Sequence, residues 1–299
     1  MGTEKNHYIP EFFLTAWSSG PQKELHVYER PGSVVVRRRR SPGGTAYHLG
    51  LYTAPLLSGN SAYWIEDDFL RKVDCDAARS HKLLITDRIE ELQGPALTAW
   101  SRFIISIWNR NPEKVFWLKQ EWAKRCEDVL DHMKRTEHEW KGKPGSPESI
   151  EDYIASGRKA EDDQRSFVRL QQTVMDLENV GQMLNNMRRA VITVGDSPER
   201  FLTSDRPILL QNGLAQGYVA MPISPEKLFV TFNRQGQLEE LQAWGGRPLV
   251  AHINGRIVKQ AKRFVFSAED MMTGFIERRL GKFPDEVHWA TFQRPQIAL

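Results

Sequence analysis

The chain carries its clearest folding signal at Ile65–Ala77, which reads IEDDFLRKVDCDA. Apolar side chains recur there every four residues, at Ile65, Phe69, Val73 and Ala77, and most of the positions between them are charged. A repeat of this period places the apolar side chains on one face of an α-helix, and such a face is normally buried. The stretch therefore predicts an amphipathic helix that packs one face against the rest of the protein.

Strand-like runs stand on both sides of a helix-rich middle region at about 61–190. Short runs of β-branched and aromatic residues bounded by turn residues are typical of strands, and they occur at 25–28, 34–36, 190–194, 201–205, 218–223 and 228–232. Strands from both chain ends can meet in one sheet that buries a helical layer. We predict an α+β protein, a single domain over 1–299, with a mixed sheet built from N- and C-terminal segments packed against the central helical region.

The composition of the 299 residues, 40% hydrophobic and 26% charged, is that of an ordinary globular protein and excludes a disordered or collagen-like chain. No apolar run approaches the roughly 20 residues that span a bilayer, and the N-terminus lacks the apolar segment of a secretion signal. We therefore expect no membrane partner. Two cysteines, Cys75 and Cys126, are too few for a disulfide framework and favour a reducing cytoplasm. A net charge of +3 does not by itself indicate nucleic-acid binding.

Several short motifs follow one another along the chain. They are NHYIPEFFL at 6–14, FLTSDRP at 201–207, PISP at 222–225, Asn254, and AKRFVF at 261–266. In order and spacing they resemble the DUF4238 family, a bacterial domain of unknown function, over about residues 6–267. The acidic residues between Glu66 and Asp74 also lie where that family carries acidic positions, whereas Arg206 stands where a small polar residue is commoner. The resemblance implies one coherent fold and no particular activity.

One histidine and one late aspartate are candidate catalytic residues. His7 stands just before a predicted helix, and an imidazole can act near neutral pH as a base, a proton donor or a metal ligand. Asp205 ends a predicted strand within a polar cluster, and polar positions on loops often carry function. The alternatives are structural, because His7 could hydrogen-bond to the backbone and Asp205 could fix the turn before Pro207.

The predicted helix at Ile65–Ala77 offers further carboxylates. Asp74 is the third candidate catalytic residue, and the candidate metal ligands are Glu66, Asp74 and Asp205. Oxygen ligands of this kind suit Mg²⁺ or Mn²⁺, and such an ion could activate water for phosphodiester hydrolysis. The alternative is a solvated helix face on which these acids pair with neighbouring basic residues.

A run of four arginines supplies a candidate phosphate-binding strand. The candidate substrate-binding residues are Arg37, Arg38, Arg39, Arg40, Tyr8 and Ser204. Guanidinium groups match the geometry of phosphate oxygens, and the nearby Tyr47, His48 and Tyr52 could stack on bases. The alternative is a charged edge strand, which discourages the pairing of one sheet with another.

The carboxylates, the histidine and the arginines together favour a metal-dependent nuclease or phosphodiesterase that acts on a phosphate-containing substrate. A nucleic acid or nucleotide is then the expected partner, with Mg²⁺ or Mn²⁺ as cofactor. The sequence has no zinc-protease, nucleophile-elbow, P-loop or dinucleotide-binding motif that would indicate another chemistry. The alternative is a non-enzymatic module that binds a nucleic acid, a nucleotide or a protein.

Overall fold

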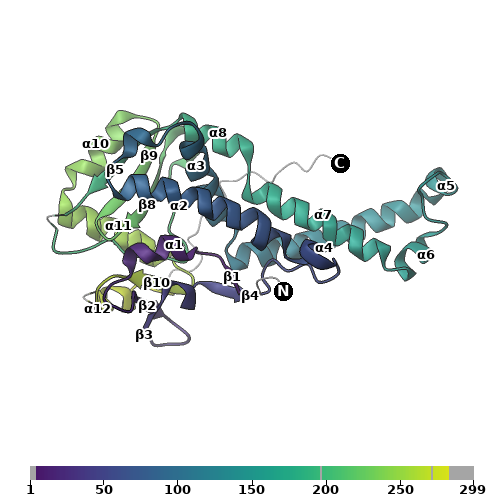
Figure 1. Ribbon diagram of the computed structural model, residues 1–299, viewed down its shortest axis with the longest axis horizontal. Coiled ribbons are helices and arrows are strands. Elements are labelled where there is room, and N and C mark those ends of the chain that lie inside the picture. The colour runs from purple at the N-terminus through teal and green to yellow at the C-terminus, as the bar shows by residue number, and fades with distance from the viewer. Residues whose placement is uncertain (1–4, 196, 271, 283–299) are drawn as a thin grey trace.

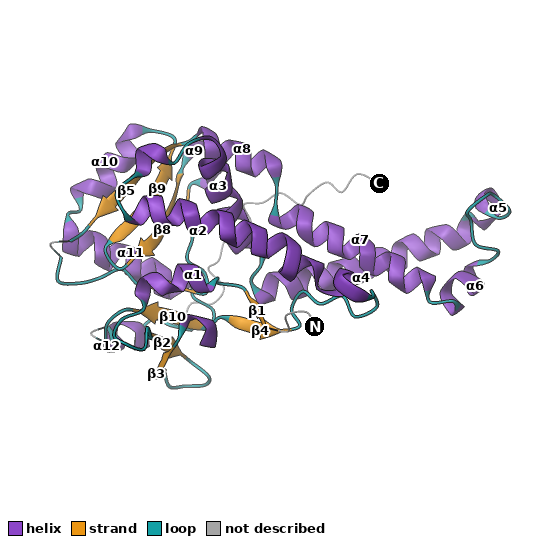
Figure 2. Ribbon diagram, viewed as in Figure 1, coloured by secondary structure: helices purple, strands orange, loops and turns teal. Residues whose placement is uncertain are grey.

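The computed structural model describes residues 5–195, 197–270 and 272–282. It shows a body of sheets and helices from which a pair of long helices projects (Figure 1). The described strands lie in the body, and the projecting part is helical (Figure 2). The α+β prediction is confirmed by this arrangement.

One four-stranded sheet joins the two ends of the chain. Its strand order is β3 (Val36–Arg40), β2 (Leu25–Glu29), β10 (Phe264–Ser267) and β6 (Thr203–Ser204). Val27 lies opposite Phe266, and Val265 lies opposite Ser204. The predicted meeting of N- and C-terminal segments is therefore confirmed.

A second sheet of four strands forms the centre of the body. Its order is β5 (Arg188–Thr193), β9 (Lys227–Phe232), β8 (Tyr218–Ser224) and β7 (Leu209–Gln211). Side chains of a strand point alternately to its two faces, and both faces here are buried. Met221 packs in a core with Trp100 on one face, and Ala220 packs in a second core with Ile253 on the other.

The predicted single mixed sheet is instead three antiparallel sheets among the described residues. The third sheet pairs β1 (Lys5–His7) with β4 (Tyr47–Leu49). The described strand pairs are antiparallel. In the pairs β2–β3, β7–β8 and β8–β9 a short connection, such as Pro225-Glu226 between β8 and β9, reverses the chain direction. A parallel pair would need a much longer crossover.

Two long helices cover one face of the central sheet. They are α2 (Arg71–Ile85), which continues a π-helical turn η4 (Ile65–Leu70), and α3 (Gly94–Asn109). The four apolar side chains that predicted a buried face, from Ile65 to Ala77, are at most 6% exposed, so that prediction is confirmed. The His81 imidazole Nε2 lies 2.7 Å from the Ile223 carbonyl oxygen, which fixes α2 to the end of β8.

The projecting part consists of α4 (Pro112–Arg135), α5 (Glu137–Trp140), α6 (Ile150–Ala155) and α7 (Arg158–Met175). The indole N–H of Trp122 donates to the Asp163 carbonyl oxygen at 3.1 Å and ties α4 to α7. The chain leaves the helical conformation after α7 and resumes it in α8 (Glu178–Asn186). Asp176, bound by Arg102 at 2.6 and 2.8 Å, leaves the helical conformation at that break.

The remaining helices are α1 (Glu11–Leu14), α9 (Gly213–Gln216), α10 (Gln235–Ala243), α11 (Gly246–Gln260) and α12 (Thr273–Glu277). Within the described ranges, no helix combines the length and the apolar character needed to cross a bilayer.

Candidate active site

His7 lies at the end of β1, where its backbone pairs with Tyr47. Its Nε2 atom lies 3.3 Å from the Gly43 carbonyl oxygen and 3.7 Å from a carboxylate oxygen of Glu11. The ring packs edge-on against Tyr47, with 5.6 Å between ring centroids. Burial lowers the pKa of His7 below 6.5, although Glu11 opposes this shift. The imidazole is therefore neutral at neutral pH and can accept a proton.

Glu66 lies on the π-helical turn η4 and reaches the backbone of His7. Its carboxyl group accepts a hydrogen bond from the His7 backbone N–H. Burial raises the pKa of Glu66 to about 8; the Arg110 guanidinium opposes this rise and Asp74 adds to it. Glu66 therefore holds a proton at neutral pH. Single π-helical turns occur often at functional sites, and this one turns an acid toward β1.

Arg110 follows the last residue of α3, and its side chain is completely buried. Its Nη1 donates to both carboxylate oxygens of Asp74, at 2.9 and 3.2 Å. The Arg110 carbonyl oxygen accepts a 2.6 Å hydrogen bond from the Tyr52 hydroxyl, which holds the backbone in place. Burial raises the pKa of Asp74, and the contact with Arg110 opposes that rise.

Three polar atoms of this group have no hydrogen-bond partner among the described residues. They are Nε and Nη2 of Arg110 and Oε2 of Glu66. An unpaired buried donor costs roughly 1–3 kcal/mol, and a charged one costs more. Two free N–H groups of one guanidinium match two oxygens of a phosphate or carboxylate. We call His7, Glu66, Asp74 and Arg110 the Arg110 cluster; it combines a neutral base, a protonated acid and donors for an oxyanion.

Asp205 has a different environment from the other two predicted catalytic residues. Its carboxylate accepts hydrogen bonds from the backbone N–H groups of Lys262, Arg263 and Phe264, at 3.0, 2.6 and 3.1 Å. Burial raises its pKa to about 6, although these amides oppose the rise. No hydrogen bond or ion pair joins Asp205 to a member of the Arg110 cluster. Its contacts fit the structural alternative, in which it fixes the chain between β6 and β10.

Ser204, a predicted substrate-binding residue, also serves the local backbone. Its side chain is fully buried, and its Oγ accepts a 3.1 Å hydrogen bond from the Arg206 backbone N–H. This is a serine turn, which holds the chain in the bend that follows β6. The hydroxyl is therefore occupied within the fold.

A hollow of about 200 Å³ lies where the N-terminal, central and C-terminal segments meet. It is lined by Tyr8, Tyr47, His48, Asn111, Pro112, Glu113, Phe116, Asp205 and Arg263. Tyr47 contacts the His7 ring and Asn111 follows Arg110, so the hollow borders the Arg110 cluster. The structure thus places predicted Tyr8 and Asp205 at this hollow, and predicted His7, Glu66 and Asp74 beside it.

The predicted metal ligands are divided between these two places. Among the residues that the structure describes, no three His, Cys, Asp or Glu side chains are grouped so that they could hold a metal ion. Asp74 is bound to Arg110, and Asp205 is bound to three amides. These residues do not fit a shared Mg²⁺ or Mn²⁺ site, and the metal stays a prediction from the sequence.

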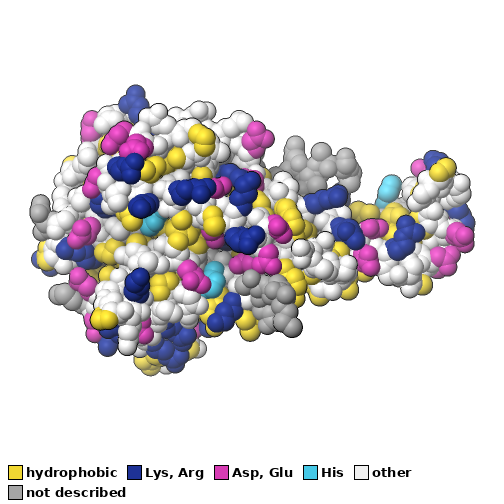
Figure 3. Space-filling model, in the orientation of Figure 1, with side chains coloured by type: hydrophobic (Ala, Val, Ile, Leu, Met, Phe, Trp, Pro, Cys, Tyr) yellow, Lys and Arg dark blue, Asp and Glu magenta, His cyan; other side chains and the backbone are white. Residues whose placement is uncertain are grey.

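The four arginines lie on β3, an edge strand of its sheet, and basic side chains gather there on the surface (Figure 3). Arg37 forms an ion pair with Asp270, and the Arg39 Nε lies 3.2 Å from a Glu24 carboxylate oxygen. Arg40 donates to the Gly44 carbonyl oxygen at 3.2 Å, while Arg38 is exposed. The two ion pairs reduce the positive potential of the strand, which fits the edge-strand alternative.

Sequence reasoning missed Arg110, although a signal for it exists. Arg110 follows Phe103 and Ile107 at i+7 and i+3, which continues the apolar face of α3. A lone arginine on a buried helix face requires a carboxylate partner. That spacing, read together with Asp74, would have indicated the pair.

The fold and this site define an α+β protein with a buried acid–base cluster between a short N-terminal strand and the helical layer. The family model "Protein of unknown function (DUF4238)" matches residues 5–271. The chain therefore belongs to the DUF4238 family, as the spaced motifs indicate. Comparison with curated proteins and with solved structures found no match.

Proposed function

We propose that this protein hydrolyses a phosphate-containing substrate, as a phosphodiesterase or nuclease, and that the Arg110 cluster is its active site. The observation that carries the proposal is the pair of free Arg110 N–H groups beside the protonated Glu66. A buried guanidinium with two free donors can hold two phosphate oxygens. The low dielectric of a buried site strengthens this binding as charge develops during reaction.

The two neighbouring groups supply proton transfer. In the tautomer that donates Nε2–H to the Gly43 carbonyl, Nδ1 of His7 is free to accept a proton from an attacking water. The water oxygen then bonds to phosphorus and the bond to the leaving oxygen breaks. Glu66 donates its proton to that leaving oxygen. Acid–base steps of this kind contribute typically 10²–10⁴-fold to rate.

The Arg110 cluster reaches solvent through His7 and Asp74. The side chain of His7 is 15% exposed and that of Asp74 is 24% exposed, while Arg110 is fully buried. We propose that the phosphate enters from this side and that the neighbouring hollow receives the rest of the substrate. Tyr8 and Tyr47 in that hollow offer aromatic surface for a base.

The test is hydrolysis of bis-p-nitrophenyl phosphate and of single- and double-stranded nucleic acids. Each substrate is assayed with Mg²⁺, with Mn²⁺ and with a chelator, since the sequence predicts a metal. The variant Glu66→Gln removes the acid proton and keeps the shape, so we expect a loss of about 10²–10⁴-fold in kcat. The matched control is Asp68→Asn, an exposed acid on the same π-helical turn. Equal activity of Glu66→Gln and the control would refute the site.

A second candidate function is a non-enzymatic module that binds a nucleic acid, a nucleotide or a protein. The observation that favours it is that Ser204 and Asp205 accept hydrogen bonds from backbone N–H groups and so stabilise the fold. A chain that binds such a ligand and hydrolyses none of the substrates above would support this candidate. Both Cys75 and Cys126 are free thiols, and we propose a reducing compartment, the cytoplasm, for either function.

A further inference from the structure

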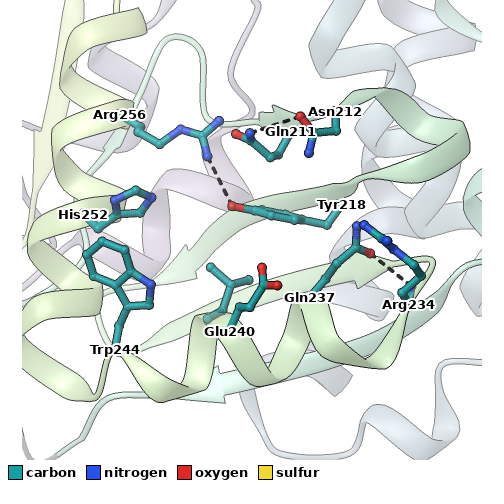
Figure 4. Close-up of a pocket in the computed structure, with 10 residues that line it drawn as sticks. Gln211, Asn212, Tyr218, Arg234, Gln237, Glu240, Trp244, His252 and Arg256 are labelled. Atoms are coloured by element: carbon teal, nitrogen blue, oxygen red, sulfur yellow. Dashed lines mark hydrogen bonds between the residues drawn. The ribbon is translucent and has the colours of Figure 1, made fainter.

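A second hollow, of about 300 Å³, lies on the far side of the central sheet from α2 and α3, between the sheet edge, α10 and α11 (Figure 4). It is lined by Gln211, Asn212, Tyr218, Arg234, Gln237, Glu240, Leu241, Trp244, His252 and Arg256. No residue of the Arg110 cluster or of its neighbouring hollow takes part. Ligand pockets of proteins have volumes of roughly 300–1,000 Å³, so this hollow suits a small ligand.

One end of the hollow carries an exposed aromatic surface. Trp244 directly follows α10, and its side chain is 47% exposed although it is the largest apolar side chain in the hollow. Its ring packs on the His252 imidazole, with 4.5 Å between ring centroids. Burial and the nearby Arg256 lower the pKa of His252, so the imidazole is a neutral support for the indole. The free indole face can accept a planar ring.

Arg256 lies at the same end and carries an uncompensated charge. Its Nη1 donates to the Tyr218 hydroxyl at 3.3 Å, and its Nη2 donates to the Leu210 carbonyl oxygen at 3.2 Å. Both acceptors are neutral. In the described part of the chain, no carboxylate forms an ion pair with Arg256. A half-buried guanidinium held by neutral groups gives the hollow a positive potential.

The opposite end of the hollow carries a second arginine. Figure 4 shows Arg234 and Gln237 there, with Tyr218 between the two ends. Gln237 accepts hydrogen bonds from the backbone N–H groups of Asn233 and Arg234, which fixes the start of α10. Arg234 also makes no ion pair with a carboxylate of the described residues. Its guanidinium and the positive end of the nine-residue α10 both favour an anion here.

The distance between the two ends follows from α10. The Cα atoms of Arg234 and Trp244 are ten residues apart, which is roughly 15 Å along a helix at about 1.5 Å per residue. The side chains of Arg234 and Trp244 both line the hollow. A ligand with a planar ring at one end and an anion at the other fits this spacing. Glu240, between the two ends and without an ion-pair partner among the described residues, can accept hydrogen bonds from hydroxyl groups.

We propose that this hollow binds a nucleotide. The base stacks on Trp244, the sugar hydroxyls donate to Glu240, and the phosphate binds Arg234 and the start of α10. Arg256 adds positive potential at the base end. The same chemistry is offered by a free nucleotide and by one unit of a nucleic acid strand, and the test distinguishes these two sources.

The test is isothermal titration calorimetry of the full chain at low salt. The probes are adenosine and guanosine mono- and diphosphates, inorganic phosphate, and a short single-stranded oligonucleotide. Trp244→Leu removes the stacking surface, and Arg234→Gln removes the phosphate contact; each should weaken nucleotide binding at least about tenfold. Arg256→Gln should also weaken nucleotide binding. Because Arg256 donates a hydrogen bond to the Leu210 carbonyl oxygen, the thermal unfolding of this variant is measured together with the titration.

Arg247→Gln is the matched control, since Arg247 lies exposed on α11 outside the hollow and pairs with Glu199. It makes the same change in net charge, and we expect unchanged binding. Strong binding of the oligonucleotide with the same dependence on Trp244 also supports the proposal and identifies nucleic acid as the source. Absence of binding of both the free nucleotides and the oligonucleotide, equal affinity for inorganic phosphate, or unchanged affinity in Trp244→Leu would overturn it. This experiment measures binding and not hydrolysis. A negative result would therefore refute the nucleotide site without refuting the proposed hydrolase activity of the Arg110 cluster.

Discussion

Arg110 binds Asp74 through Nη1 alone, at 2.9 and 3.2 Å, and leaves its Nε and Nη2 without partners among the described residues. A buried arginine that served only to neutralise an aspartate would normally use two nitrogens in a bidentate pair. Arg102 and Asp176 form such a bidentate pair elsewhere in the body. The one-nitrogen contact keeps the rest of the Arg110 guanidinium available for another anion.

Replacement of Arg110 should strongly destabilise the fold. Arg110→Leu leaves Asp74 without its cation in a largely buried position, and removal of one partner of a buried pair costs about 3–5 kcal/mol in the free energy of unfolding. Urea denaturation at neutral pH measures this loss. The double variant Arg110→Leu, Asp74→Asn should recover part of it, because the unpaired charge is then gone. If the double variant were less stable than the single variant, the pair would not be coupled in this way.

The raised pKa of Glu66 predicts a stability that falls as pH rises. The folded state holds the Glu66 proton up to about pH 8, whereas the ordinary value is 4.5. The unfolded chain therefore binds fewer protons between these values, and the free energy of unfolding decreases across that range.

The range from pH 6.5 to pH 7.5 is the best place to measure this effect. The lowered histidine pKa values lie below 6.5, the pKa of Asp205 is about 6, and the pKa of Lys114, which burial lowers to about 8, lies above this range. We expect the urea midpoint of the wild type to fall across that range. In Glu66→Gln most of this slope should disappear. A slope that persists unchanged in Glu66→Gln would mean that another group titrates there.

His81 should make the protein sensitive to acid. Burial lowers its pKa from 6.5 to about 4, although the Ile223 carbonyl oxygen opposes the shift. As pH falls, the unfolded chain binds this proton before the folded chain does. The contribution of neutral His81 to the free energy of unfolding is therefore fully present above pH 6.5 and is lost as pH falls toward 4. A shift of this size corresponds to about 3 kcal/mol. Urea denaturation of wild type and His81→Gln at both ends of this range measures it, with the exposed His138→Gln as control. An acid loss equal in all three proteins would contradict the assignment to His81.

The sequence predicts those helices and strands whose pattern depends only on residues close together in the chain. The four-residue period from Ile65 to Ala77 predicts the buried face of η4 and α2, because it depends only on helix geometry. The strands of both chain ends were predicted from short apolar runs. Their antiparallel pairing was not, because the contact of Val27 with Phe266 depends on chain segments that the pattern of either run does not describe.

The candidate site was predicted in part for the same reason. His7, Glu66 and Asp74 were recognised from residue type and position, and the structure brings all three to Arg110. Arg110 itself was missed because its burial depends on Asp74, 36 residues earlier in the chain. The role of Asp205 was left open by the sequence because its three amide partners come from residues 262–264.

Asp205 should contribute far more to stability than to chemistry. Asp205→Ala leaves the backbone N–H groups of residues 262–264 without their acceptor. The bond from Phe264 is buried and the bonds from Lys262 and Arg263 are partly buried, and an unpaired buried donor costs roughly 1–3 kcal/mol. We expect a loss of about 3 kcal/mol in the free energy of unfolding, measured by urea denaturation. Ser204→Ala removes a single acceptor and should cost about 1 kcal/mol. If phosphodiesterase activity is found, the fraction of Asp205→Ala that remains folded should retain it. A stable Asp205→Ala protein without activity would show instead that the carboxylate takes part in the reaction, as one interpretation of the sequence holds.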